Sequence, residues 1–178
     1  MARVGLLTFS DGRDFVHADI KAFSLDVESR ITEALEQAGH EVIRAAEPIW
    51  TNTMATTEAR RVADARPDLT IFNYAVWAFP HFSMLAAAAS PGPLLLFSNI
   101  DPQFPGMVGM LAAGGGLDQI GRAHTRVWVT WPTRRCGTEF WRRSGPPLPC
   151  RPCRAVPSAG SAAARWGCTP RWRTPISG

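Results

Sequence analysis

The stretch RVGLLTFSDGRD, residues 3–14, decides the fold of this chain. Its first seven residues form an apolar run rich in residues that favour β-structure, and the sequence SDG that follows favours a turn. A short apolar run that ends at a turn is typical of a buried strand. From residue 18 the apolar residues recur at helical spacing as far as Gly39, which is placed to end a helix. The stretch therefore predicts a strand followed by a helix.

The same alternation of strand and helix continues along the chain to residue 129. We expect strands within residues 38–45, 68–77, 92–100 and 124–129, and helices within 56–67, 81–90 and 104–121. The expected strands are almost continuously apolar, which is typical of a parallel sheet covered by helices on both faces. The pattern predicts an α/β fold with four to five parallel strands.

The composition changes near Trp128. Residues 1–128 carry 10 Lys and Arg against 14 Asp and Glu, a net charge of −4, whereas residues 129–178 carry 9 Arg, no Lys and one acid, a net charge of +8. The later part also holds all 4 cysteines and 8 of the 15 prolines. It lacks apolar periodicity and has too little apolar surface to offset its chain entropy. We expect one folded domain over residues 1–128 and a mostly disordered tail over 129–178.

Several classes of protein are excluded by the absence of their motifs. The first residues, MARVGLLTFSDG, hold too few apolar residues for a signal peptide, and no window approaches a transmembrane helix, so we expect a cytoplasmic protein without a membrane partner. No dinucleotide or P-loop glycine motif is present. The histidines His17, His40, His81 and His124 lack metal-ligand spacing. A triad of Ser10, His17 and Asp11 would be arbitrary, because no nucleophile-elbow motif G-x-S-x-G is present.

Polar or aromatic residues follow three of the expected strands directly, at Asp11–Arg13, Tyr74–Trp77 and Asn99–Asp101. Ligands of open α/β sheets bind at the carboxyl ends of the strands, so we expect these clusters along one edge. Each cluster taken alone can be explained without a ligand, because Asp and Gly form turns and Trp77 can cap a core. Their joint placement favours a binding edge.

Three motifs resemble the amino-terminal domain of L-fucose isomerases and of their L-arabinose isomerase relatives. They are VGLLTFSDGRDFVH before a long amphipathic helix, NYAVWAFP around Trp77, and LLLFSNIDPQFPGMVGMLAAGGGLDQIGRAHTRVW. The resemblance covers about residues 3–128. It implies a flavodoxin-like (Rossmann-like) first domain of an aldose–ketose isomerase of carbohydrate metabolism.

The resemblance also implies how such an enzyme works. A divalent ion, usually Mn²⁺, is held by two carboxylates and a histidine in later domains, and a proton moves between C1 and C2 through an enediol. The enzymes are homo-oligomers, and the first domain lends residues to the sugar site of a neighbouring subunit. By position, Arg13 and Trp77 would contact the aldose, such as L-fucose or L-arabinose. Asp11 would orient Arg13 or accept a hydroxyl proton. We expect no catalytic residue and no metal ligand in this chain, and no activity from it alone.

The tail has three interpretations. Cys136, Cys150, Cys153 and Cys168 suggest a zinc site, but they include only one C-x-x-C pair. Arg with Trp suggests a nucleic-acid arm, although such arms normally use Lys as well. A frame shift in GC-rich DNA is the third. If one G is lost after the Trp128 codon, the restored reading begins W-G-D-[LMV]-A-D-P and supplies the WGD that the family has after its fifth strand. Residues 156–178 can then be restored to a text containing G-G-R-S-L-G-M, which resembles the start of the family's second domain.

Three hypotheses for the function stay open at this point. The chain is a fragment of a sugar isomerase, a free-standing flavodoxin-like module that binds a small polar ligand at the edge with Asp11, Arg13 and Trp77, or a protein whose tail binds zinc or nucleic acid. We favour the first, which implies a sugar partner, no nucleic acid, and no metal bound to this chain.

Overall fold

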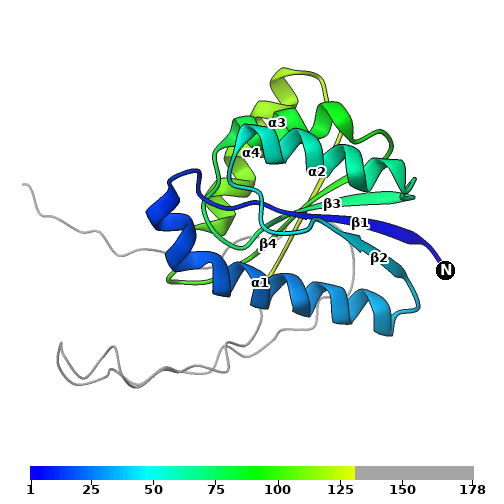
Figure 1. The fold of residues 1–178 in the computed structure, drawn as a ribbon, viewed down its shortest axis with the longest axis horizontal. Coiled ribbons are helices and arrows are strands. Elements are labelled where there is room, and N and C mark those ends of the chain that lie inside the picture. The colour runs from blue at the N-terminus through cyan, green and yellow to red at the C-terminus, as the bar shows by residue number, and fades with distance from the viewer. Residues whose placement is uncertain (131–178) are drawn as a thin grey trace, which may run out of the picture. The chain divides into compact units, whose positions relative to one another are not determined.

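The computed structural model describes residues 1–130 (Figure 1). Of the tail expected over residues 129–178, Val129 instead ends a strand, and residues 131–178, with all four cysteines, lie outside the described residues. Strands and helices alternate strictly in the order β1 (Arg3–Thr8), α1 (Asp14–Gln37), β2 (Glu41–Arg44), α2 (Asn52–Asp64), β3 (Leu69–Tyr74), α3 (Pro80–Ala89), β4 (Leu94–Asn99), α4 (Gly106–Gln119) and β5 (Thr125–Val129).

The five strands form one parallel sheet in the order β2-β1-β3-β4-β5. In the centre of the sheet Leu6 pairs with Ile71, and Phe72 pairs with Leu96. This strand order is the flavodoxin-like variant of the doubly wound fold. The predicted α/β fold with a parallel sheet of four to five strands is confirmed.

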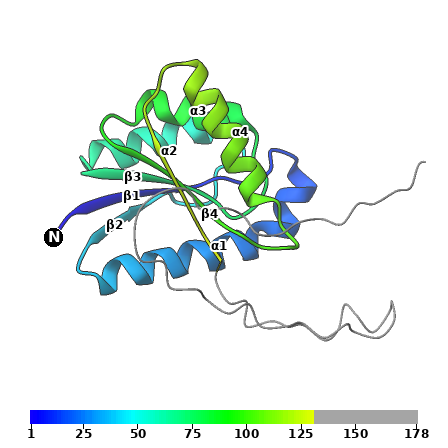
Figure 2. The same cartoon turned by 180° about the vertical axis from the view of Figure 1, so that it is seen from behind.

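Helices cover both faces of the sheet, but unequally. Helix α1 lies on one face, and α2, α3 and α4 lie on the other (Figures 1 and 2). Because side chains alternate along a strand, Leu6 of β1 packs toward α1 while its neighbour Leu7 packs toward the other three helices. The larger core on the three-helix face holds most of the fully buried side chains, among them Phe9, Phe72, Tyr74, Leu96, Met110 and Leu117.

Two helices begin about one turn before the ranges expected from the sequence. Helix α1 starts at Asp14 rather than near residue 18, and α2 starts at Asn52 rather than at 56. The reason in α2 is the hydroxyl of Thr51, whose Oγ1 accepts a hydrogen bond from the Met54 backbone N–H at 3.2 Å and caps the helix. Gly39 has φ of +83° directly after α1, which confirms its predicted role as the end of that helix.

Candidate functional site

The carboxyl ends of β1, β3 and β4 bring the three expected clusters to one edge of the sheet. Thr8 at the end of β1 pairs with Asn73, and Tyr74 at the end of β3 pairs with Ser98. The segments that carry Asp11–Arg13, Tyr74–Trp77 and Asn99–Asp101 therefore leave the sheet side by side. This edge is where α/β sheets bind ligands.

Asp11 and Arg13 form a tight pair in the loop between β1 and α1. Asp11 Oδ1 accepts hydrogen bonds from the Arg13 backbone N–H and from Nε, both at 2.9 Å, and Asp11 Oδ2 accepts one from Nη2 at 2.7 Å. The Asp11 side chain is only 2% exposed, whereas that of Arg13 is 56% exposed. A buried carboxylate thus holds one edge of a guanidinium group whose other edge faces solvent.

The electrostatics of the pair fix its protonation state. The hydrogen bond from the Arg13 side chain lowers the pKa of Asp11 below its ordinary value, although burial opposes this shift. Asp11 is therefore ionised at neutral pH, and both of its oxygens are occupied by Arg13. This geometry suits a group that orients Arg13 better than one that accepts a proton from a ligand.

Trp77 lies in the segment after β3, and helix α4 packs closely against the backbone of this segment. A Cβ atom on Gly109 would lie 3.0 Å from the Ala78 backbone nitrogen and 3.4 Å from the Cα of Trp77, and one on Gly106 would overlap the carbonyl oxygen of Tyr74. The glycine spacing in PGMVG thus lets the helix approach this backbone closely. Trp77 itself is half-buried, and its ring meets that of Phe79 edge-on at 6.3 Å between centroids.

Phe79 connects the Trp77 segment with the Arg13 loop. A Cβ on Gly12 would lie 3.1 Å from Phe79 Cδ2 and 2.8 Å from Phe82 Cζ, so the loop rests directly on these rings. Gly12, which precedes Arg13, and Trp77 therefore share Phe79 as an aromatic neighbour. The structure brings the predicted residues to one region of the edge.

Asp101 has a local role in the third cluster. Its Oδ1 accepts a hydrogen bond from the Gln103 backbone N–H at 2.8 Å and forms a turn before α4. Asn99 at the end of β4 is buried, with 3% of its surface exposed. Turn formation, which was the alternative to a binding role, therefore accounts for Asp101.

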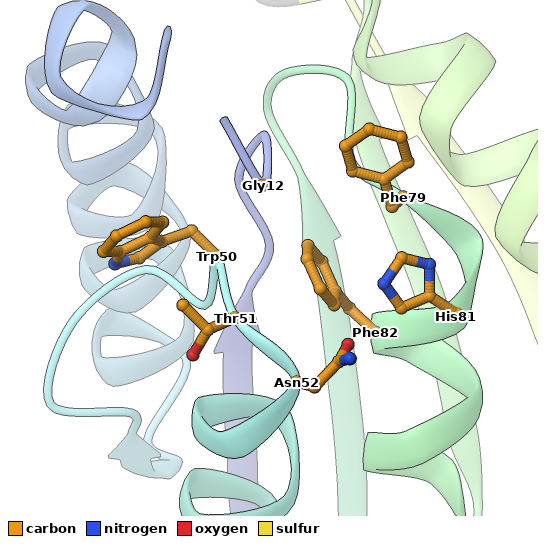
Figure 3. A pocket seen from close by; sticks show the side chains of 7 residues that line it. All are labelled: Gly12, Trp50, Thr51, Asn52, Phe79, His81 and Phe82. Carbon is orange, nitrogen blue, oxygen red and sulfur yellow. The ribbon is translucent and has the colours of Figure 1, made fainter. Parts of the chain in front are cut away.

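A shallow pocket of about 300 Å³ opens beside the Arg13 loop. Figure 3 shows its walls, which come from the β1–α1 loop, the start of α2 and the start of α3: Gly12, Trp50, Thr51, Asn52, Phe79, His81 and Phe82. None of the three predicted binding residues lines it, although Gly12 stands between Asp11 and Arg13. Trp50 was not predicted from the sequence; it lies in the loop between β2 and α2, two residues before the helix begins.

Ser10 and His17 lie together under this edge. His17 Nδ1 is 2.9 Å from Ser10 Oγ, and the imidazole stacks on Trp50 at 5.0 Å between centroids. Both residues are buried, with 0% and 5% of their surface exposed, and burial lowers the pKa of His17. Asp11 binds Arg13 instead of His17, so these residues do not form a catalytic triad.

A family comparison decides the identity of the folded part. Residues 1–134 match the family of the first N-terminal domain of L-fucose isomerase. The chain belongs to this family. The predicted resemblance is thereby confirmed, and the chain is an isomerase-family fragment in this part. No curated protein sequence matches the chain.

Among residues 1–130, no three side chains of His, Asp or Glu come together in a way that could hold a metal ion. These residues do not fit the Mn²⁺ that the resemblance implies, so no reaction step can be assigned to a metal here.

The described helices also include none that is long and apolar enough to cross a membrane. The cysteines of the zinc hypothesis lie outside the described residues.

Proposed function

We propose that this chain is a fragment of an L-fucose isomerase-like aldose–ketose isomerase of cytoplasmic carbohydrate metabolism. Its domain supplies Arg13 and Trp77 to the sugar site of a neighbouring subunit in a homo-oligomer. The family match supports an isomerase fragment. The observation that carries the role of the domain is the exposed Arg13 guanidinium, which a buried carboxylate holds at the ligand-binding edge of the sheet.

Each of the three residues has a distinct role in this proposal. Arg13 donates hydrogen bonds from its solvent-facing edge to sugar hydroxyls, because Asp11 occupies Nε and one side of Nη2. Asp11 is a positioning residue that keeps the guanidinium in one orientation. Trp77 packs its ring against the apolar side of the sugar, and Phe79 with α4 holds the segment in place.

The chemistry itself requires groups beyond these residues. Isomerisation needs a base that moves the proton between C1 and C2, and a divalent ion such as Mn²⁺ supplies stabilisation of the enediol in enzymes of this kind. The described residues bind and orient; the base and the metal ligands belong to later domains. The 178-residue chain alone should therefore be inactive.

The proposal includes a shift of reading frame after the Trp128 codon. Trp128 ends in G and Val129 begins with GT, so the shifted codon is Gly whichever synonymous codons are used. Trp131 and Pro132 likewise give Ala. The restored W-G-D and G-G-R-S-L-G-M texts support this part of the proposal.

The test compares the chain with a repaired version in which one G is inserted after the Trp128 codon. With Mn²⁺ present, the repaired protein should convert L-fucose or L-arabinose to the ketose, and the 178-residue chain should not. Arg13→Ala and Trp77→Ala should each lower kcat/KM of the repaired enzyme roughly tenfold to a hundredfold. Arg60→Ala is the matched control, because Arg60 is exposed on α2 away from this edge. Activity in the short chain, or unchanged kinetics in both site variants, would overturn the proposal.

The pocket beside Gly12 favours a second candidate, a module that binds a small polar ligand without catalysis. Aromatic walls with Asn52 and His81 at the rim are suited to a compact polar molecule. This candidate predicts that L-fucose added to the 178-residue chain shifts the backbone NMR signals of Gly12 and Asn52. Unchanged signals at millimolar sugar would remove it.

A further inference from the structure

Phe15 is the most exposed large apolar residue among residues 1–130 apart from the terminal Met1, with 69% of its surface exposed. It lies in the first turn of α1, two residues after Arg13, and it belongs to neither of the two core clusters. Its ring therefore adds little to the apolar area that folding buries. The Cζ atom of Arg13 lies over this ring, 6.0 Å from its centroid. This distance is within reach of a cation–π contact.

The backbone of Arg13 is anchored on both sides of its Cα atom. Its N–H donates a hydrogen bond to Asp11 Oδ1 at 2.9 Å. Its carbonyl oxygen accepts a hydrogen bond from the His17 N–H at 2.8 Å, which closes the first turn of α1. His17 is itself buried, and its ring stacks on Trp50. The direction of the Arg13 side chain is therefore determined by the contacts of its guanidinium group.

Asp11 occupies one edge of that guanidinium group. An arginine side chain has five N–H donors in one plane. Asp11 accepts from Nε and from one N–H of Nη2, which leaves three of the five donors for a ligand among the described residues. These two hydrogen bonds act as a hinge, because tilting the plane about them changes the donor–acceptor distances little. Asp11 alone therefore does not fix the tilt of the plane.

Phe15 supplies the contact that Asp11 lacks. Its ring lies against a face of the guanidinium group, whereas Asp11 lies in the plane of the group. Attraction between the cation and the ring disfavours tilting away from the ring. The edge contact and the face contact together select one orientation of the plane.

We infer that Phe15 is a positioning residue for Arg13 in the proposed sugar site. Its ring holds the guanidinium group so that Nη1 and the outer N–H of Nη2 point side by side toward the ligand. Such a fork suits two neighbouring oxygen atoms, which two adjacent hydroxyl groups of an aldose provide. The inference rests on the proposed function, because the sugar is the ligand that Arg13 would bind.

A double-mutant cycle in the 178-residue chain tests the contact itself. Arg13→Ala, Phe15→Leu and the double variant are compared with the parent by urea denaturation. Phe15→Leu keeps an apolar side chain and removes the ring. An exposed cation–π contact should appear as a coupling of about twofold to fivefold in the equilibrium constant of folding. Leu25→Ala is the control, because Leu25 is exposed further along the same helix and should show no coupling with Arg13→Ala.

The kinetics of the repaired enzyme test the positioning role. Phe15→Leu should raise KM for L-fucose about twofold to fivefold with little change in kcat, because the contact orients a group that binds the sugar. Phe15→Tyr keeps the ring and should restore the parent value. In the Arg13→Ala background, Phe15→Leu should have no further effect, because Phe15 acts through Arg13.

The possible failures are distinguishable. Unchanged kinetics of Arg13→Ala would overturn the proposed function together with the inference. A lower kcat/KM of Arg13→Ala beside parent-like kinetics of Phe15→Leu would overturn the inference alone, as would the absence of coupling in the 178-residue chain. An equal effect of Phe15→Leu with and without Arg13 would show that Phe15 contacts the sugar itself, and would also overturn the positioning role.

Discussion

Replacing Glu28 by Gln tests the effect of a buried carboxyl group on the stability of the domain. The Glu28 side chain in α1 is 4% exposed, and its Oε1 lies 3.6 Å from Arg44 Nη1. Its Oε2 has no hydrogen-bond partner among the described residues. Burial raises the pKa of Glu28 above its ordinary value, and the Thr8 hydroxyl and Arg44 oppose the shift only in part.

The size of the effect follows from these contacts. A buried polar atom without a partner costs about 1–3 kcal/mol, and more if it is charged. The half-exposed Arg44 offsets part of this cost, so Glu28→Gln should stabilise the domain by about 1 kcal/mol at pH 7. Because the folded-state pKa is raised, Glu28 contributes stability that is present at low pH and lost as the pH rises through that pKa. The difference between variant and parent should therefore vanish near pH 4.

Urea denaturation followed by circular dichroism at pH 7 and pH 4 measures this difference. Glu33→Gln is the control, because Glu33 is exposed on the same helix, and its free energy of unfolding should not change at either pH. A Glu28→Gln variant that is less stable than the parent at pH 7, or equally altered at both pH values, would refute the reasoning.

Two further predictions concern the glycines of α4 and the buried histidine. Gly109→Ala should destabilise the domain by about 1–3 kcal/mol and shift tryptophan emission, because its methyl group would press on Ala78 and Trp77. Gly115→Ala, with open space around it, should instead stabilise α4 by about 0.5–1 kcal/mol in the same urea assay. Burial lowers the pKa of His17, so the free energy of unfolding should fall as the pH drops below about 6.5. The variant His17→Gln should show a smaller decline between pH 7 and pH 5. A decline as steep as that of the parent would contradict the prediction.

The fold was predictable because apolar periodicity has the same cause in the sequence and in the structure. The apolar run of β1 is buried on both faces, and Gly39 has the positive φ that its place after a helix requires. The start of α2 was missed because its first turn is polar and is fixed by the Thr51 cap, whereas α1 begins at Asp14 without a side-chain cap. Thr51 could have been found from its place before NTM, but apolar spacing alone does not report it.

The candidate site was predictable in its location and not in its contacts. Asp11, Arg13 and Trp77 lie at one edge because they follow the carboxyl ends of parallel strands, independently of their side-chain contacts. Sequence spacing does not reveal that Asp11 is buried and Arg13 exposed, because exposure depends on contacts with distant segments, such as the packing of Gly12 against Phe79 and Phe82. Whether these residues bind a sugar stays a prediction.

For Glu28, the polar–apolar pattern of the helix predicts exposure to solvent, and the structure shows it buried. It is a charged residue on a helix whose polar positions are mostly exposed, yet it lies beside Val27 on the buried side of α1. Ser24 and Thr32, one turn before and after, are also buried, and each donates its hydroxyl hydrogen to the carbonyl oxygen four residues earlier. This polar stripe lies over Thr8, which also accepts a hydrogen bond from Asn73 at 3.1 Å. The polar interior of this face depends on contacts between distant segments, which a single-sequence pattern does not contain.

In the proposed function, binding and catalysis are separable because different domains of the enzyme supply them. Asp11 orients Arg13, and the close approach of Gly109 fixes the Trp77 segment, entirely within residues 1–130. Both arrangements are formed by residues that precede β5. Among residues 1–130, no three side chains could together hold a metal ion. If the proposed function is right, loss of the Arg13 side chain should lower kcat/KM of the repaired enzyme. It should also destabilise the domain, because it leaves the buried Asp11 carboxylate without its side-chain partner.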